Sequence, residues 1–371
     1  MPRLVLAGTG SKYRGQRVKA PARWLGIVTA IALLIGCGQE SGGSPSPSPP
    51  ATSSPSPSPA PAAALPCRMP VDLRTDQGGN RQVLGYLSLP SGATTDDPTD
   101  AIVKVADFPV DANGTVPIWG TSTSPPLFGV GFGTHSSAAG RWLPAPPQLV
   151  SPDGRHYVYR HANGTLRLAA VDGSEIPVAN PNDLAPLAYT ISGIVLVQNG
   201  PAANGLWLLD PTTQAVTVIT PPAGTDDWRE VSGLMAFGVD SPGALGAPPP
   251  TVVMESSLVP GSTPHPVYTA APGNVIALIA GDGQGGVLIV VTGSSSGQLI
   301  YLSPSGPPPG LEPAPDGVVL STSGRSHHAD AHGIWFVGPT GIFLFNHSSN
   351  LPLKRIAAGV GSDVAPGGDC T

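Results

Sequence analysis

The sequence predicts an all-β protein that is built from short strands and tight turns. Glycine (48 residues) and proline (46 residues) make up about a quarter of the 371-residue chain, and they disfavour helix interiors by about 1 and 3 kcal/mol per site. Such a composition also suits a disordered chain. However, 40% of the residues are hydrophobic and 11% are charged, so the chain has enough apolar surface to bury a core. A repeat within residues 67–371 narrows this class to a β-propeller.

The N-terminal segment has the order of an export signal. Six basic residues and no acidic residue occur up to position 23, and an apolar run of about 12 residues follows over 24–35. This run is shorter than the ~20 residues of a membrane-spanning helix. It ends in Leu34-Ile35-Gly36-Cys37, which resembles the lipobox of bacterial lipoproteins. The resemblance implies a signal peptide over 1–36 and diacylation of Cys37; the alternative is an uncleaved anchor with a chance cysteine.

A Ser/Pro-rich stretch follows the predicted lipidation site. Residues 41–66 contain nine prolines and eight serines, and such a segment buries no core and favours extended, polyproline-like conformations. Two acyl chains are sufficient for stable membrane anchoring. We therefore expect residues 37–66 to tether a folded domain, 67–371, to the outer face of the bacterial cytoplasmic membrane or within the periplasm.

The other two cysteines lie at the two ends of the predicted domain. Cys67 follows the tether, and Cys370 is the second-last residue of the chain. An exported protein lies in an oxidising compartment, which favours their pairing. A disulfide that closes a loop of about 300 residues stabilises a fold by several kcal/mol in the chain-entropy model. The alternative is two unrelated thiols.

A paired pattern of apolar runs recurs in residues 67–371. In each copy the first run follows a glycine, and the five glycines are Gly154, Gly193, Gly233, Gly286 and Gly333. Their intervals of 39, 40, 53 and 47 residues match the length of a four-stranded propeller blade. We interpret each pair as the second and third strands of a blade, with the first strand of the last blade over 318–320. We expect at least one more blade over 67–141. The sequence thus predicts six blades, or alternatively seven, in a ring that the terminal disulfide closes, since an open ring exposes two sheet edges.

Two short motifs resemble known propeller repeats. Ser151-Pro152-Asp153-Gly154 before an apolar strand is similar to the repeat of TolB-type and other WD-like bacterial propellers. The residues from Asp330 to Trp335, with the run that starts at Gly341, are similar to the repeat of two-component-regulator sensor propellers. The exported part as a whole resembles bacterial lipoproteins that carry a propeller on a Ser/Pro-rich spacer. These resemblances imply the fold and name no ligand.

The densest polar cluster, residues 326–332, holds three of the eight histidines. In an extended strand, His328, Asp330 and His332 point to one face, and imidazole and carboxylate ligands suit zinc or manganese. These residues are our candidate metal ligands for the alternative function, a metal-dependent propeller enzyme of the lactonase or lyase kind that uses a central-channel site. The structural alternative is that Asp330 stabilises a turn and that the histidines line a loop. We predict no cofactor, with a divalent metal as the alternative.

A second polar cluster precedes the expected first strand at Val231. Asp226, Asp227, Trp228 and Arg229 suit a sugar- or peptide-binding rim on which Trp228 stacks. They equally suit a solvated turn with a packing tryptophan.

Charge and motifs narrow the function further. After Cys37 the chain has 12 basic and 24 acidic residues, which argues against nucleic-acid binding. The sequence also has no nucleophile elbow and no phosphate-binding loop before a helix. We therefore predict a cell-envelope lipoprotein, membrane-bound through its lipid, whose propeller is a non-catalytic module that binds an envelope protein, peptide or glycan. A structural role in envelope complexes is a third hypothesis.

Overall fold

The computed structural model describes most of the predicted domain, in the ranges 65–74, 82–96, 134–143, 145–160, 165–180, 182–198, 205–222, 227–240, 249–293, 297–304, 312–313, 327–338, 341–346, 353–358 and 364–371. These residues belong to one compact unit, Ala60–Thr371. The predicted signal peptide, Cys37 and nearly all of the tether lie outside the described residues. Within the described ranges, no helix has the length and apolarity to cross a membrane.

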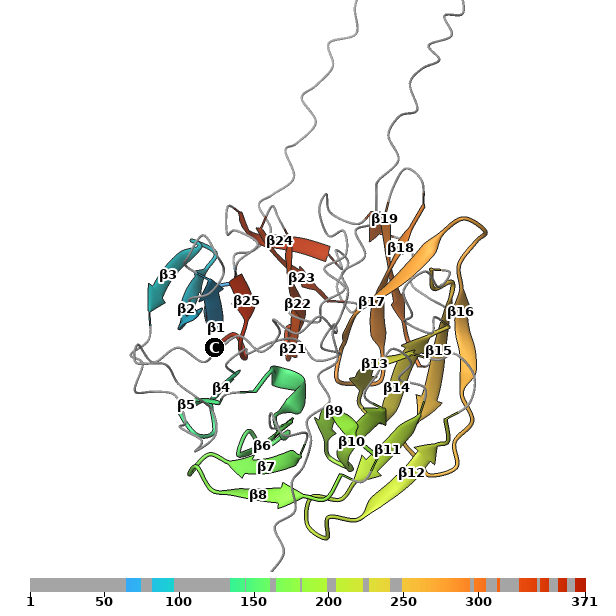
Figure 1. Cartoon of the computed structure of the whole chain (residues 1–371). Coiled ribbons are helices and arrows are strands. Elements are labelled where there is room, and N and C mark those ends of the chain that lie inside the picture. Colours follow the sequence, from blue (N-terminus) through green and yellow to red (C-terminus); the bar gives the residue numbers. More distant parts are fainter. Residues whose placement is uncertain are drawn as a thin grey trace, which may run out of the picture. The chain divides into compact units, whose positions relative to one another are not determined.

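The described strands form seven antiparallel sheets (Figure 1). The first has the spatial order β25 (Val364–Pro366), β1 (Cys67–Arg74), β2 (Gln82–Leu89) and β3 (Ala93–Asp96). The second pairs β4 (Thr134–Ser136) with β5 (Arg141–Leu143). After the short 3-10 helix η2 (Pro147–Leu149), the third contains β6 (His156–Arg160), β7 (Leu166–Ala170) and β8 (Glu175–Val178).

Each of the other four sheets contains four strands that are consecutive in sequence. One comprises β9 (Leu184–Thr190), β10 (Gly193–Gln198), β11 (Leu206–Leu209) and β12 (Val216–Thr220). The next comprises β13 (Asp227–Ser232), β14 (Met235–Val239), β15 (Val252–Ser257) and β16 (His265–Thr269). Then follow β17 (Val275–Gly281), β18 (Val287–Thr292), β19 (Gly297–Leu302) and β20 (Glu312–Pro313). The last comprises β21 (His327–Asp330), β22 (Gly333–Gly338), β23 (Gly341–Phe345) and β24 (Leu353–Ala358).

Neighbouring sheets pack face to face, and the series closes on itself. The strands β6, β9, β13, β17, β21 and β25 each contact the next in this order. The backbone N–H of His135 in β4 donates to the carbonyl of Gly367 (2.7 Å), and the Ser136 hydroxyl donates to the carbonyl of Gly154 (2.6 Å). These bonds connect the β4–β5 sheet to its two neighbours. A closed series of radially packed antiparallel sheets is a β-propeller, which confirms the predicted fold class.

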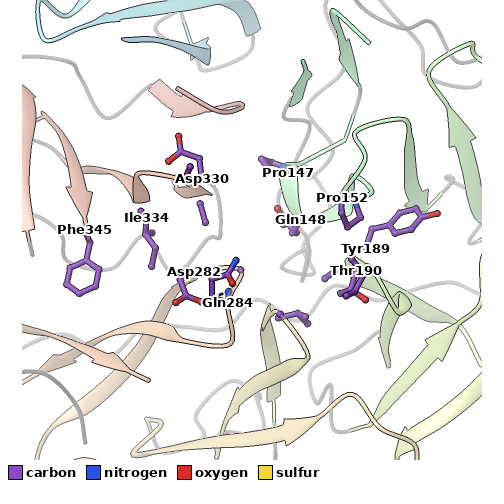
Figure 2. A pocket seen from close by; sticks show the side chains of 18 of the residues that line it. Pro147, Gln148, Pro152, Tyr189, Thr190, Asp282, Gln284, Asp330, Ile334 and Phe345 are labelled. Carbon is purple, nitrogen blue, oxygen red and sulfur yellow. Dashed lines mark hydrogen bonds between the residues drawn. The ribbon is translucent and has the colours of Figure 1, made fainter. Parts of the chain in front are cut away.

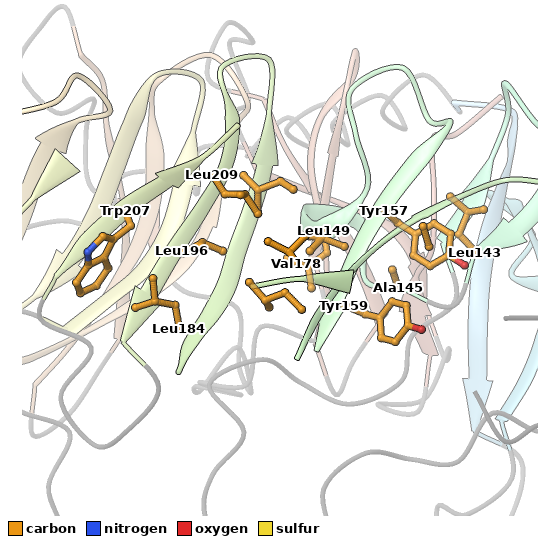
Figure 3. Close-up of a cluster of buried hydrophobic side chains, with 14 residues drawn as sticks. Leu143, Ala145, Leu149, Tyr157, Tyr159, Val178, Leu184, Leu196, Trp207 and Leu209 are labelled. Carbon is orange, nitrogen blue, oxygen red and sulfur yellow. The ribbon is translucent and has the colours of Figure 1, made fainter. Parts of the chain in front are cut away.

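Buried apolar side chains fill the spaces between sheets. Figure 3 shows the cluster that joins the β6–β8 sheet to the β9–β12 sheet, with Tyr157, Val178, Leu196 and Leu209 among its members. Separate clusters lie between the following sheets, and one of them joins β22 and β23 to β1 and β2. A middle strand of a blade is covered on both faces, so its residues are apolar throughout rather than alternating.

The structure corrects two expected strand positions. We expected the first strand of the last blade over 318–320, which lies outside the described residues. β21 (His327–Asp330) instead pairs with β22. The described residues of the second polar cluster, Asp227 to Arg229, lie within β13 and not before it. Both strands carry several polar residues, so an apolar pattern did not mark them.

The number of blades stays a prediction. We assigned residues 67–141 at least one blade, and the structure places two sheets there, one of which is completed by β25. The described part of the β4–β5 sheet has two strands. If this sheet is counted as a blade of its own, the ring has seven blades, the alternative that the sequence left open.

The two ends of the domain close the ring together. Cys67 and Cys370 form the predicted disulfide, with their Cα atoms 5.5 Å apart. Arg68 and Thr371 exchange two backbone hydrogen bonds (2.8 and 3.2 Å). β25 extends the sheet that β1 begins. The ring is therefore closed by a shared sheet as well as by a covalent bond.

The glycine before each apolar run has a steric cause in two blades. Gly193 and Gly333 begin the second strands of their sheets with φ of 130° and 133°. A Cβ atom at Gly193 would lie 2.7 Å from the carbonyl oxygen of Leu209, and one at Gly333 would overlap the carbonyl oxygen of Phe345. Only glycine fits this close approach to the third strand.

Candidate functional site

A cavity of about 930 Å³ lies where the turns of neighbouring blades converge (Figure 2). Its wall contains residues from the turns that follow β9, β13, β17 and β21, which are the turns between the first and second strands of four blades. The segment from Pro147 to Pro152 supplies the facing part of the wall. The blade repeat therefore brings equivalent turns to one site.

Asp282 fixes the turn after β17. Its carboxylate accepts hydrogen bonds from the Ser232 hydroxyl (2.7 Å), from the backbone N–H groups of Gln284 and Gly286 (2.8 and 2.9 Å) and from the Tyr301 hydroxyl. Burial by itself would raise the pKa of Asp282, but these hydrogen bonds hold it below its ordinary value. The cavity wall therefore contains an ionised carboxylate whose donors are all neutral.

Asp330 has the same role in the turn after β21. Its side chain is only 3% exposed, and its carboxylate accepts the backbone N–H groups of His332 (2.7 Å) and Cys370 (3.0 Å). The His332 ring nitrogen lies 3.3 Å from the same carboxylate. This is the turn-stabilising role that the structural alternative predicted. The bond from Cys370 also connects the cavity wall to the disulfide.

Of the candidate metal ligands, His328 and Asp330 lie in β21, and His332 lies in the turn after it. The His328 ring lies 2.8 Å from a carboxylate oxygen of Asp369, whose pKa this hydrogen bond lowers. His328 and Asp330 thus both contact the C-terminal residues, and Asp330 and His332 contact each other. Among the described residues, no group of three or more His, Cys, Asp or Glu side chains is arranged to hold a metal ion. Metal binding at these residues stays a hypothesis.

Two titratable residues outside the predicted site residues meet near the cavity. A Glu230 carboxylate oxygen of β13 lies 3.8 Å from the His327 ring of β21, and their side chains are 16% and 13% exposed. Burial raises the pKa of Glu230 to about 7, against hydrogen bonds from the backbone N–H groups of Gly281 and Val231. Burial, with the nearby His328, lowers the pKa of His327 to about 4. No sequence motif indicated this pair, because the packing of three blades creates it.

The predicted ligand rim is largely interior. Asp226 lies outside the described residues. Arg229 donates two hydrogen bonds to one carboxylate oxygen of Asp227 (2.9 and 2.5 Å), and Asp227 is buried. Burial raises the pKa of Asp227, and Arg229 opposes this shift. Trp228 is 1% exposed and packs in the core between two sheets, so its ring is not presented for stacking on a ligand.

Two cavity side chains have polar groups that are free to meet a ligand. The carboxamides of Gln148 and Gln284 belong to residues that line the cavity, and they have no intramolecular hydrogen-bond partner in the described structure. Figure 2 shows Gln148 across the open space from Gln284. No lysine or arginine is among the described residues that line the cavity. No sequence pattern places these two glutamines together, so they were not among the predicted site residues.

Comparisons with known proteins give a fold likeness at low identity. No protein-family model and no curated protein matches the chain. Similar solved structures include a protein described as a gluconolactonase (14% identity, TM-score 0.34, 57% of this chain and 76% of the other). Another is AztD from Citrobacter koseri (11% identity, TM-score 0.33, 79% and 71%). A third is prolyl oligopeptidase B from Galerina marginata (12% identity, TM-score 0.38, 79% and 51%), of which the chain spans about half the length.

Proposed function

We propose that this protein is a lipid-anchored binding protein of the bacterial cell envelope, whose propeller holds its ligand in the cavity between the blade turns. The observation that carries the proposal is the cavity itself, with the unengaged carboxamides of Gln148 and Gln284 in its wall. Ligand sites commonly have volumes of about 300–1,000 Å³ and a few placed polar groups. The cavity of about 930 Å³ has both properties.

The anchoring part of the proposal rests on the lipobox-like end of the apolar run and on the Ser/Pro-rich stretch after it. The described chain enters the propeller beside Cys67, which is bonded to Cys370. Cys370 in turn contacts Asp330 of the cavity wall. We infer that the cavity lies at the end of the propeller to which the tether is attached.

A Cys37→Ser variant tests the anchor. Without the thiol there is no site for diacylation, so we expect the variant to leave the membrane fraction, while the wild type and a Ser41→Ala control stay in it. Cell fractionation of the bacterial host and detergent phase separation measure the share of each protein that stays with the membrane. Membrane retention of the Cys37→Ser protein would contradict the lipid anchor.

An Ala331→Trp variant tests the cavity as the ligand site. Ala331 is an exposed turn residue in the cavity wall, so an indole there occupies ligand space without entering the core. We expect this variant to lose the ligand-induced rise in melting temperature of the full chain, screened in detergent against oligosaccharides and peptides. Ala271→Trp, in an exposed turn outside the cavity wall, is the matched control. Equal ligand responses of both variants would contradict the proposal.

A further inference from the structure

The chemistry of the cavity wall defines a class of ligand. The geometry points to an uncharged oligosaccharide, bound between the carboxamides of Gln148 and Gln284 on facing parts of the wall. This inference rests on the proposed function, because it takes the cavity as the ligand site.

The two carboxamides are held on fixed backbone. Gln148 lies in η2 between Pro147 and the buried Leu149. The backbone N–H of Gln284 is bound by the Asp282 carboxylate at 2.8 Å. A carboxamide offers two donors and an acceptor, so one such group serves two neighbouring hydroxyls, which act as both donors and acceptors. Two facing carboxamides therefore suit a polyhydroxylated ligand that spans the cavity.

The charges of the wall disfavour an anionic ligand. Asp282 and Asp330 belong to the cavity wall, and among the described lining residues no cation compensates them. A ligand anion would meet two carboxylates at low solvent exposure, where repulsion between like charges is strong. Acidic sugars, nucleotides and phosphate esters are therefore poor ligands.

The same carboxylates are poor direct partners for a cation. The carboxylate of Asp282 already accepts from Ser232, Tyr301 and two backbone N–H groups, and Asp330 is engaged by His332 and Cys370. The groups left for a ligand are the neutral carboxamides. Specific recognition at this wall is thus recognition of uncharged hydrogen-bonding groups.

Apolar surface and size complete the fit. Ile191 lines the cavity and is 81% exposed, so it offers apolar area against which the C–H face of a sugar ring packs. A cavity near the upper end of the range for small ligands holds several sugar units rather than one.

Titration calorimetry of the full chain in detergent tests the class directly. The probes are maltotetraose and chitotetraose as neutral chains, tetragalacturonate as an acidic chain, the chitosan tetramer as an amine-bearing chain, and a neutral tetrapeptide. We expect at least one neutral chain to bind and the acidic chain not to bind. Preferential binding of the acidic, amine-bearing or peptide probe would overturn the inference.

Substitutions of the two glutamines test whether the probe binds in the cavity. We expect Gln148→Ala and Gln284→Ala each to weaken binding of the neutral chain roughly three- to tenfold, the range for one lost hydrogen bond. Gln198→Ala, at an exposed strand end outside the cavity wall, should leave the affinity unchanged. Gln284→Glu keeps the size but adds charge, so it should weaken a neutral ligand and strengthen a cationic one.

The outcomes separate this inference from the proposed function. If a peptide or a cation binds and Ala331→Trp removes that binding, the cavity is the ligand site and the oligosaccharide inference is overturned. If a neutral chain binds but Ala331→Trp and the glutamine variants leave its affinity unchanged, both are overturned.

Discussion

Glu230 and His327 are two ordinary titratable residues whose protonation is set by where the blades place them. Glu230 belongs to β13 and His327 to β21, and the Glu230 carboxylate also accepts the backbone N–H of Gly281 at the end of β17. Burial favours the neutral form of both groups. Three blades thus meet at a pair that holds little charge near neutral pH.

We expect the two contributions of this pair to offset each other between pH 4.5 and 6.5, and the stability to fall below and above this range. The folded pKa of Glu230 is about 7 against 4.5, so its stabilising contribution is complete below pH 4.5 and is lost as the pH rises through 7. The folded pKa of His327 is about 4 against 6.5. Its contribution is complete above pH 6.5 and is lost as the pH falls through 4. Each pKa unit corresponds to about 1.4 kcal/mol.

Glu230→Gln isolates the alkaline side of this dependence. The glutamine side chain does not ionise, so the variant should lose less stability than the wild type when the pH rises from 5 to 8. Urea unfolding midpoints across pH 4–9 measure it, with the exposed surface substitution Asp183→Asn as the control. Parallel curves for wild type and Glu230→Gln would show that the carboxyl titrates alike in the folded and unfolded chain.

The sequence predicted side-chain contacts well where the two partners are close together in the chain. Asp330 stabilises its own turn two residues onward, an arrangement that an aspartate before a turn predicts. Gln148 and Gln284 gave no signal, and the pairing of His327 with Glu230 could not be predicted, because the neighbours of these residues come from different blades. Trp228 shows the same limit: its residue type suited a rim, and its strand places it in the core.

The turn between the first and second strands is the element that shapes the cavity. In two blades it ends at a glycine, Gly193 or Gly333, whose backbone conformation and close contact with the third strand exclude a side chain. This close approach gives a physical reason for the glycine that marks these repeat copies in the sequence.

Gly333→Ala should therefore destabilise the last blade. The added Cβ would overlap the Phe345 carbonyl at a positive φ, and we expect a loss of roughly 1–3 kcal/mol in the free energy of unfolding. Gly273→Ala is the matched control, since Gly273 also has a positive φ (85°) but no atom within 4 Å of an added Cβ. Denaturant unfolding of both variants compares the two. A Gly273→Ala loss as large as that of Gly333→Ala would contradict the steric explanation.

Strands that were predicted and strands that were missed differ in composition. The apolar runs that became β10, β18 and β22 are covered on both faces by neighbouring sheets, and a continuous apolar run indicates such a strand. β21 begins with two histidines and ends with Asp330, and β25 has three residues. Neither has a hydrophobic pattern, so only the pairing with β22 and β1 identifies them as strands.

The whole ring depends on joining residues that are 303 positions apart in sequence. We expect the double variant Cys67→Ser/Cys370→Ser to lose roughly 2–5 kcal/mol of stability, since the disulfide restricts the unfolded chain. Urea unfolding of wild type with and without reductant should reproduce this loss, and the variant should not respond to reductant. A thiol assay on the unfolded, unreduced wild type should detect neither of these cysteines. Two reactive thiols from this pair would contradict the disulfide.

The architecture was more predictable than the site. Glycine intervals, apolar runs and the terminal cysteines are properties of short segments, and they were enough for the propeller and its covalent closure. The cavity is a property of the closed ring, since its wall combines turns from blades that are far apart in the chain. Asp330 of the wall could therefore be predicted from its own sequence cluster, and the two glutamines opposite each other could not.

The shared sheet of β25 and β1 also sets the order of events when the chain is made. β1 lacks its inner neighbour until β25 has been synthesised, and the two strands belong to opposite ends of the domain. At about 5–20 residues per second, the roughly 300 residues between them take on the order of tens of seconds to emerge. During that time the first sheet presents an open edge. A chain that ends before β25 therefore keeps an unpaired sheet edge, which can pair with other chains.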